Sequence, residues 1–320
     1  MRAIAGLLLL AALSGFVGAV SALAGEFIYV ADQDGRILIL DPLSNKVAAK
    51  IDVARGPVGL AVAAEQGRVY ATHPDIGAIT VLDAEHLRVI ATLQIGGAPF
   101  GIAVARDGAS LLVGDWNSGA VSRVDVRTGA ISAVARVGRS PAAVVIDKAG
   151  HRLYVADREG GMVFVLDAAT LREIAVAPVG KAPFAMALAP DDGRLYVGNV
   201  QDGSLMVIDA LALKPLATIP VGSMPYGVAA TPDGRRILVA NQQAGVLSII
   251  DAERLETIGL VKIGRYPEGI AIAGDGRTAY VANWFSGDVS VVETASGAEI
   301  ARIKTGGAPR SLLVVRSGSR

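Results

Sequence analysis

The sequence predicts an all-β protein, a seven-bladed β-propeller of four-stranded antiparallel blades that is closed by pairing of its N- and C-terminal strands. Each repeat unit contains short β-rich runs separated by Gly, Asp and Asn turns, as is typical of one blade. Proline recurs every 42 residues, at Pro57, Pro99, Pro141, Pro183, Pro225, Pro267 and Pro309. An acidic residue keeps the same period, at Asp41, Asp83, Asp125, Asp167, Asp209, Asp251 and Glu293. Two independent markers therefore count seven units.

The unit that begins at Pro225 illustrates the expected order of strands. Its predicted strands cover 227–230, 237–240, 246–251 and 256–261. The turn at Asp233-Gly234 separates the first two. Outside the N-terminal segment, no stretch of adequate length has helical periodicity.

The periodic residues have structural roles in this fold. The acidic residue ends the third strand, where its carboxylate can accept backbone N–H groups in an Asx-type turn. The proline fixes φ in the connection between blades, where no ladder hydrogen bond is needed. A glycine one or two positions later allows the innermost strand to approach the propeller axis. We therefore do not expect the periodic aspartates to be catalytic.

The two ends of the chain are complementary. Residues 27–30 read as a second strand with no first strand before them, and residues 309–315 read as a first strand without the other three. We expect the C-terminal strand to complete the blade begun by residues 27–53, which would remove the open sheet edges.

The N-terminus has the features of an export signal. Arg2 precedes an uncharged run that includes four consecutive leucines, and Ala22-Leu23-Ala24 fits a signal-peptidase site. We expect a signal peptide over 1–24, a single propeller domain over 25–320, and a periplasmic or secreted location. The alternative is an uncleaved membrane anchor, since the run is long enough to span a bilayer.

Composition restricts the classes of function. The 30 Lys and Arg residues balance 30 Asp and Glu residues, so no global field attracts nucleic acid or an anionic membrane. The chain contains no cysteine, which excludes disulfides, thiolate metal sites and a cysteine nucleophile. The apolar content of 52% provides for a large core.

Four second-strand segments carry a resemblance to a known family. They read Tyr154-Val155-Ala156-Asp157, Tyr196-Val197-Gly198-Asn199, Leu238-Val239-Ala240-Asn241 and Tyr280-Val281-Ala282-Asn283. They resemble the tetrapeptide of the YVTN-family β-propeller repeats, and the similarity extends over nearly the whole mature chain. The resemblance implies the propeller fold and a place among exported bacterial proteins of several roles. His73 stands at the Asn position of its unit, which is a local departure.

In an up-and-down blade the loops after the second and fourth strands emerge on the same face, which we call the looped face. The residue after each periodic proline lies there, at the axial mouth. These residues are Val58, Phe100, Ala142, Phe184, Tyr226, Glu268 and Arg310. Three aromatic residues, one acid and one base form a candidate small-molecule site. Alternatively, the aromatic residues plug the channel and Glu268 pairs with Arg310.

Basic residues occur two positions before four of the prolines, at Arg55, Arg139, Lys181 and Arg265. On the looped face they form a partial positive ring that suits a carboxylate, a phosphate or an acidic partner. The alternative is neutralisation by acidic residues of the neighbouring loops. These are Asp32, Asp34, Asp75, Asp115, Asp157, Glu159 and Asp202.

Both tryptophans, Trp116 and Trp284, follow second strands on this same face. They are candidate binding anchors, or they pack over a neighbouring blade. The three histidines, His73, His86 and His151, occupy unrelated positions of different units, so the sequence predicts no metal site. No nucleophile elbow, Walker loop or dinucleotide fingerprint occurs in the required context, and no cofactor is predicted.

The leading hypothesis is a non-catalytic, monomeric binding module that recognises a protein or a small anionic ligand through its looped face. The alternative is a periplasmic enzyme of lactonase-like or quinoprotein dehydrogenase-like type, with Glu268 beside Tyr226 as an acid or base at the axial mouth. Nucleic-acid binding is disfavoured by the neutral charge and by export.

Overall fold

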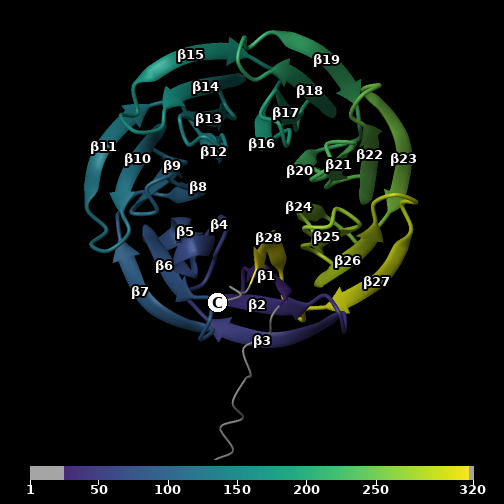
Figure 1. Cartoon of the computed structure of the whole chain (residues 1–320), viewed down its shortest axis with the longest axis horizontal. Coiled ribbons are helices and arrows are strands. Elements are labelled where there is room, and N and C mark those ends of the chain that lie inside the picture. Colours follow the sequence, from purple (N-terminus) through teal and green to yellow (C-terminus); the bar gives the residue numbers. More distant parts are fainter. Residues whose placement is uncertain (1–24, 317–320) are drawn as a thin grey trace, which may run out of the picture.

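A computed structural model describes residues 25–316, which form a closed ring of seven antiparallel sheets around a central axis (Figure 1). The predicted fold is confirmed. The predicted signal peptide, 1–24, lies outside the described residues. In each blade the first strand lies nearest the axis and the fourth forms the rim. No helix within 25–316 is long and apolar enough to cross a membrane.

The first four blades contain these strands. Blade 1 contains β28 (Pro309–Arg316), β1 (Glu26–Asp32), β2 (Arg36–Asp41) and β3 (Lys46–Asp52). Blade 2 contains β4 (Leu60–Ala63), β5 (Arg68–His73), β6 (Ala78–Asp83) and β7 (Arg88–Gln94), with the short 3-10 helices η1 (Ala64–Gln66) and η2 (Pro74–Ile76) in its loops. Blade 3 contains β8 (Pro99–Val104), β9 (Ser110–Asp115), β10 (Ala120–Asp125) and β11 (Ile131–Arg136). Blade 4 contains β12 (Pro141–Ile146), β13 (Arg152–Asp157), β14 (Met162–Asp167) and β15 (Glu173–Pro178).

The remaining three blades follow the same order. Blade 5 contains β16 (Pro183–Leu188), β17 (Arg194–Asn199), β18 (Ser204–Asp209) and β19 (Pro215–Pro220). Blade 6 contains β20 (Pro225–Ala230), β21 (Arg236–Asn241), β22 (Val246–Asp251) and β23 (Glu256–Lys262). Blade 7 contains β24 (Pro267–Ile272), β25 (Thr278–Asn283), β26 (Asp288–Glu293) and β27 (Glu299–Lys304).

The core is divided into layers between neighbouring blades. Among the described residues, seven apolar clusters occupy the seven blade boundaries. In β1, Ile28 and Val30 pack against blade 7, whereas Tyr29 and Ala31 pack against blade 2. This division follows from the two-residue side-chain period of a strand. Because both faces of such strands are buried, they read as nearly continuous apolar runs.

The ring closes as the sequence predicted. β28 pairs antiparallel with β1, with Phe27 opposite Val315 and Val30 opposite Leu312. The two terminal strands therefore share blade 1, and they lie side by side in Figure 1. At the edge of the closure, the Arg316 Nε donates to Glu26 at 2.8 Å, and Glu26 accepts the backbone N–H of Gly274 in blade 7.

The roles assigned to the periodic Gly and Asp residues are confirmed. At Gly227 and Gly269 an added Cβ would overlap a backbone carbonyl oxygen of the next blade, so only glycine permits this approach to the axis. Asp167 ends its strand and accepts the backbone N–H groups of Ala169 and Thr170, at 3.2 and 2.8 Å. Equivalent turns occur at Asp41, Asp83, Asp125, Asp209 and Asp251.

These turns make the stability of the protein sensitive to acid. A hydroxyl group three residues further on lowers the pKa of Asp41, Asp125 and Asp167 below the usual value of 3.8, with backbone N–H groups contributing in the same direction. Below pH 3.8 the unfolded chain therefore binds more protons at these sites than the folded protein does. The stabilisation is complete above pH 3.8 and is lost as the pH falls through the lowered, folded-state values.

We expect the triple variant Asp41→Asn, Asp125→Asn, Asp167→Asn to lose less stability than the wild type between pH 4.5 and 3. An asparagine oxygen still accepts the turn N–H groups but does not titrate. Urea unfolding at several pH values measures the effect. Equal slopes of unfolding free energy against pH for the two proteins would contradict the prediction.

Candidate functional site

The looped face is built as predicted, because each connection between blades is hydrogen-bonded to the loop after the second strand. Trp116 N–H donates to the Ala98 carbonyl at 2.9 Å, and Trp284 N–H donates to the Tyr266 carbonyl at 3.0 Å. The same type of bond joins Arg158 to Ser140. Rigid backbone therefore supports the candidate residues on this face.

Four of the candidate residues form one aromatic cluster, defined as Phe100, Trp116, Phe184 and Tyr226. The ring centroid of Phe100 lies 4.8 Å from that of Trp116 and 5.9 Å from that of Phe184. Phe184 in turn lies 4.4 Å from Tyr226. Tilted and edge-on contacts at these distances are favourable beyond the burial of area. The cluster spans blades 3 to 6 along one side of the axial mouth.

The cluster depends on a small residue between its two phenylalanines. Phe100 and Phe184 belong to blades 3 and 5, and the intervening blade 4 presents the buried Ala142 at the same position. A larger side chain there would separate the two rings. Trp116 lies 6.2 Å from Phe184, so it packs over a more distant blade as well as its own.

The other side of the axial mouth holds a buried ion pair. Arg310 donates to both carboxylate oxygens of Glu268, at 2.7 and 3.1 Å, and Gln242 Nε2 donates to Glu268 Oε1 at 2.7 Å. Glu268 is 5% exposed, and the Arg310 side chain is 20% exposed. The pairing alternative drawn from the sequence is therefore the one that the structure adopts.

Burial raises the pKa of Glu268 above its usual 4.5, while the charge and hydrogen bonds of Arg310 and the hydrogen bond of Gln242 oppose this shift. Both carboxylate oxygens are already engaged by neighbours. A general acid or base needs a proton-transfer path to a substrate. Glu268 and Arg310 therefore form a structural ion pair in this geometry.

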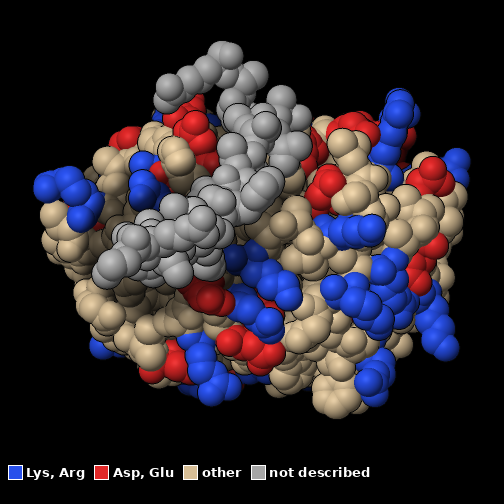
Figure 2. Space-filling view, turned by 90° about the horizontal axis from the view of Figure 1, so that it is seen from below, with Lys and Arg blue, Asp and Glu red and all other residues tan. Residues whose placement is uncertain are grey.

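The four cations of the predicted ring are exposed, at Arg55, Arg139, Lys181 and Arg265. Within residues 25–316 none of their side chains forms an ion pair within 4.0 Å. Several neighbouring acids bind other groups; Asp157, for example, accepts the backbone N–H groups of Arg139 and Ser140. Figure 2, a view of the rim, shows positive and negative residues interspersed.

A cavity of about 490 Å³ lies on the looped face between blades 4 and 5. We call it the 4–5 cavity; its lining includes Arg158, Glu159, Lys181, Gln201 and Asp202. Both acids are engaged, since Glu159 pairs with Arg158 and Asp202 accepts the backbone N–H of Lys181 at 2.6 Å. The guanidinium carbon of Arg158 lies 5.9 Å from the Trp116 ring centroid. The cavity is thus contiguous with the aromatic cluster.

Trp284 belongs to a separate group in blade 7, the blade-7 cluster, defined as Arg265, Tyr266, Trp284 and Phe285. Trp284 Nε1 donates to Gln33 Oε1 of blade 1 at 2.9 Å, so this tryptophan also packs across a blade boundary. The Arg310 guanidinium carbon lies 5.4 Å from its ring centroid. The two tryptophans of the protein therefore mark two different sites on one face.

The sequence reasoning did not identify several residues of these sites: Gln33, Arg158, Gln201, Gln242, Tyr266 and Phe285. Gln33, Arg158 and Gln242 occupy the same place in their units as the two tryptophans, directly after the second strand. Alignment of the units at that position would have located them.

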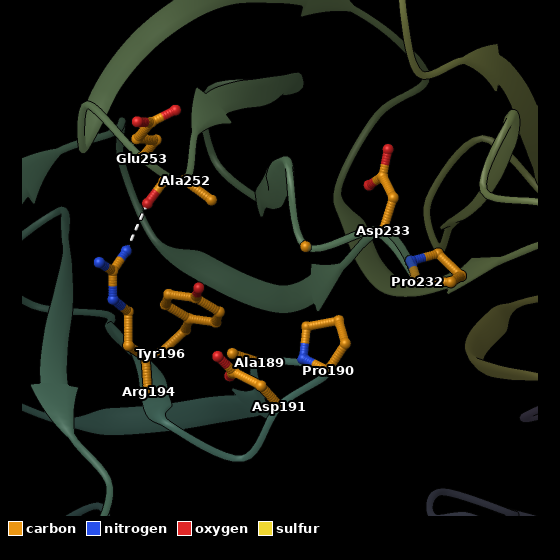
Figure 3. Close-up of a pocket in the computed structure, with 10 residues that line it drawn as sticks. Ala189, Pro190, Asp191, Arg194, Tyr196, Pro232, Asp233, Ala252 and Glu253 are labelled. Atoms are coloured by element: carbon orange, nitrogen blue, oxygen red, sulfur yellow. Dashed lines mark hydrogen bonds between the residues drawn. The ribbon is translucent and has the colours of Figure 1, made fainter.

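A second cavity, of about 430 Å³, lies between blades 5 and 6 toward the opposite face (Figure 3). Arg194 extends from β17 and donates to the Ala252 carbonyl of blade 6 at 2.5 Å, as the dashed line shows. Asp191, Asp233 and Glu253 line the opening. The arginine is used to join two blades, so this cavity does not contain the predicted site.

Two family models match parts of the chain. The Cytochrome D1 heme domain model matches residues 149–263, and the LVIVD repeat model matches residues 18–48. They support a β-propeller repeat protein. No curated protein is significantly similar in sequence to this chain.

Solved structures with the same fold include three relevant examples. Hydrazine synthase from Kuenenia stuttgartiensis is 20% identical, with a TM-score of 0.75, covering 85% of this chain and 93% of that one. A putative 6-phosphogluconolactonase from Bacteroides uniformis is 16% identical, with a TM-score of 0.78, covering 92% and 100%. A dihydro-heme d1 dehydrogenase is 18% identical, with a TM-score of 0.70, covering 90% and 75%. At these identities the likeness establishes the fold alone.

The heme group implied by the first family model can be tested against the described residues. His73 is fully buried, and its ring nitrogens contact the Arg55 carbonyl at 3.2 Å and the Thr80 hydroxyl at 2.8 Å. His86 and His151 lie in the loops β6–β7 and β12–β13, on the opposite face. No described histidine lies at the axial mouth. The described residues therefore do not fit a histidine-ligated heme there.

Proposed function

We propose that this protein is a non-catalytic recognition module, an exported propeller of the YVTN type, that binds a small anionic ligand with a flat aromatic part at the 4–5 cavity. One observation carries the proposal: Lys181, which forms no ion pair with any of residues 25–316, lines a cavity whose edge continues into the aromatic cluster. The volume is within the range of small-molecule sites.

Charge supports an anionic ligand. The two carboxylates of the 4–5 cavity already have partners, whereas the ammonium group of Lys181 has no carboxylate within 4.0 Å among the described residues. Arg139 is a second cation without an ion pair among residues 25–316, and it lies near the same loop, since its backbone N–H donates to Asp157 at the end of β13. A carboxylate, sulfonate or phosphate group of a ligand would form ion pairs with these two cations. Trp116 is only partly buried, so its ring is available to contact the aromatic part of the ligand.

Three naphthalene probes of the same shape test this proposal: naphthalene-2-carboxylate, 2-naphthalenemethanol and 2-naphthylmethylammonium. We expect the carboxylate to bind at least tenfold more tightly than the other two by titration calorimetry. Lys181→Ala and Trp116→Ala should each weaken carboxylate binding about fivefold or more, a loss of about 1 kcal/mol.

Arg55→Ala provides the matched control, since Arg55 has the equivalent position in the connection to blade 2 but lies away from the aromatic cluster. It should leave the affinity unchanged. Equal binding of all three probes, or equal losses in the Arg55 and Lys181 variants, would contradict the proposed ligand class.

An enzymatic role at the axial mouth has less support. Glu268, the acid or base of that hypothesis, is held by Arg310 and Gln242, and Tyr226 packs on Phe184. The named enzymes of similar fold share 20% identity or less with this chain.

The remaining elements of the proposal concern location and assembly. Residues 1–24 act as a signal peptide, residues 25–320 form the exported domain in the periplasm or outside the cell, and the domain acts as a monomer. The Arg2-led apolar segment ending in Ala22-Leu23-Ala24 supports export. Mass spectrometry of the exported protein tests cleavage, with Gly25 as the expected first residue.

A further inference from the structure

The blade-7 cluster differs from the aromatic cluster in being open to solvent. Phe285 is 58% exposed and Tyr266 is 40% exposed, whereas the rings of the aromatic cluster are half-buried by one another. The ring centroids of Tyr266 and Phe285 lie 5.5 Å apart, and Trp284 lies 6.0 Å from Tyr266. The exposed Tyr266 and Phe285 rings, with the partly buried Trp284 ring beside them, thus form one continuous aromatic surface. Such surfaces on soluble proteins mark interaction sites more often than single exposed residues do.

Packing of the hydrophobic core does not require aromatic residues at the positions of Tyr266 and Phe285. At the position of Phe285, blades 2 to 6 have polar residues, Asp75, Asn117, Glu159, Gln201 and Gln243. At the position of Tyr266 they have Gly56, Ala98, Ser140, Ala182, Met224 and Ala308. Five other blades are therefore built without an aromatic side chain at the Phe285 position, and six without one at the Tyr266 position.

The backbone presents Tyr266 in a disfavoured conformation. Its φ of 53° lies in the left-handed region, directly before Pro267. A bulky residue rarely adopts this conformation, and the residue before a proline is normally extended. Gly56, Ala182 and Met224 share it at the same position, so the conformation belongs to the connections that lead into blades 2, 5, 6 and 7. What is particular to blade 7 is that the connection carries a large, exposed aromatic ring.

A rigid frame supports the cluster. Phe285 N–H donates to the Arg265 carbonyl at 3.2 Å, and Arg265 N–H donates to the Ser286 hydroxyl at 2.9 Å. Trp284 is fixed by Gln33 of the next blade. Rigid aromatic side chains lose little conformational entropy on binding, and Trp and Tyr are enriched among the residues that contribute most to binding at protein interfaces.

Arg265 supplies the charge of this surface. Its guanidinium carbon lies 4.8 Å from the Phe285 ring centroid, and it has no ion-pair partner within 4.0 Å among residues 25–316. The other nearby arginine, Arg310, is occupied by Glu268. A carboxylate of a binding partner would therefore form an ion pair with Arg265. An apolar side chain next to that carboxylate would cover the aromatic rings of the blade-7 cluster.

We propose that the blade-7 cluster is a docking site for an acidic protein segment that carries an aromatic or aliphatic side chain next to Asp or Glu. The partner is a protein because the rings are exposed rather than enclosed, so only an extended surface can cover them together. This site is separate from the 4–5 cavity and goes beyond the proposed function.

Fluorescein-labelled poly(Glu,Tyr) copolymer, with poly(Lys,Tyr) for comparison, tests the docking site by fluorescence anisotropy. The variants borrow residues from the other units, so that the fold is preserved: Tyr266→Ala with Phe285→Gln, and Arg265→Ser. We expect each to weaken poly(Glu,Tyr) binding at least tenfold, and Arg265→Ser also to reduce the salt dependence of the remaining binding. Poly(Lys,Tyr) should bind at least tenfold more weakly than poly(Glu,Tyr).

Arg55→Ala is the control, since Arg55 holds the same place before its proline as Arg265 and belongs to neither proposed site. It should bind the copolymer as the wild type does, while the blade-7 variants should still bind naphthalene-2-carboxylate. The two proposals can thus fail independently. Unchanged copolymer affinity in the Tyr266 and Phe285 double variant would overturn the docking site. So would a wild-type dimer that the double variant converts to a monomer, or binding to phosphatidylglycerol vesicles without binding to the copolymer.

Discussion

Ending the chain after Ala308 is expected to abolish the folded ring. This change removes β28, which pairs with β1 from Glu26 to Asp32 and buries Leu312 and Val315. Each of these side chains stabilises the fold by about 1.5–3 kcal/mol, and each lost ladder hydrogen bond removes about 1 kcal/mol. The sum is comparable with the 5–15 kcal/mol by which a typical domain is stable. Urea unfolding followed by circular dichroism should show no cooperative transition.

The exposed edge of β1 should also make the shortened chain aggregate, because unpaired strands associate with other chains. Addition of a peptide spanning 309–316 should restore part of the folded signal. Leu312→Ala should give a graded loss of about 2–5 kcal/mol.

A chain that ends after Arg316 is the matched control, since it keeps the whole of β28 and should unfold at the wild-type urea concentration. If the chain ending at Ala308 unfolded cooperatively at that same concentration, closure by the terminal strands would not be what stabilises the ring.

Arg310→Ala is expected to destabilise the protein by about 3 kcal/mol at pH 8, the lower end of the range for removing one partner of a buried ion pair. The lower end applies because the Arg310 side chain keeps 20% exposure. Glu268 would remain buried with Gln242 as its hydrogen-bond partner. Urea unfolding of the variant and the wild type measures the deficit.

The deficit should depend on pH. Burial already raises the pKa of Glu268 above 4.5, and loss of the guanidinium removes the main opposing influence. A group whose pKa is raised on folding binds more protons in the folded state, so the penalty is absent below pH 4.5 and grows as the pH rises through the folded value. The deficit of Arg310→Ala relative to the wild type should therefore be smaller at pH 5 than at pH 8.

The double variant Glu268→Gln, Arg310→Met serves as the control, because it buries no charge and keeps a hydrogen-bonding partner for Gln242. It should be more stable at pH 8 than Arg310→Ala alone. A deficit that is the same at both pH values would show that Glu268 is not the origin of the effect.

The repeat made the fold predictable to the level of single strands. Pro309 and Asp41 each belong to a series with one period, so the strand order and the closure of blade 1 followed from counting. The Asx turns were predictable for the same reason, since an aspartate that ends a strand has few other local partners.

The site was predictable only in outline. The period of 42 residues places Glu268 and Arg310 in adjacent blades. Whether the two side chains pair depends on how much of the axial mouth the neighbouring side chains occupy. The contact of Phe100 with Phe184 depends on the small Ala142 between them, which is a property of three blades at once. The roles of Tyr266 and Phe285 could not be predicted from features that the repeat units share, because these two residues differ from those at the same positions of the other units.

The pairing of Glu26 with Arg316 determines how the propeller can be tethered. β28 runs from the looped face to the opposite face, and β1 runs back, since Gln33 at its far end bonds to the Ala308 carbonyl. Residues 25 and 316 therefore both leave the ring on the side away from the 4–5 cavity and the blade-7 cluster. A bead, a fusion partner or an uncleaved anchor attached at either end would present both sites outward, free for capture.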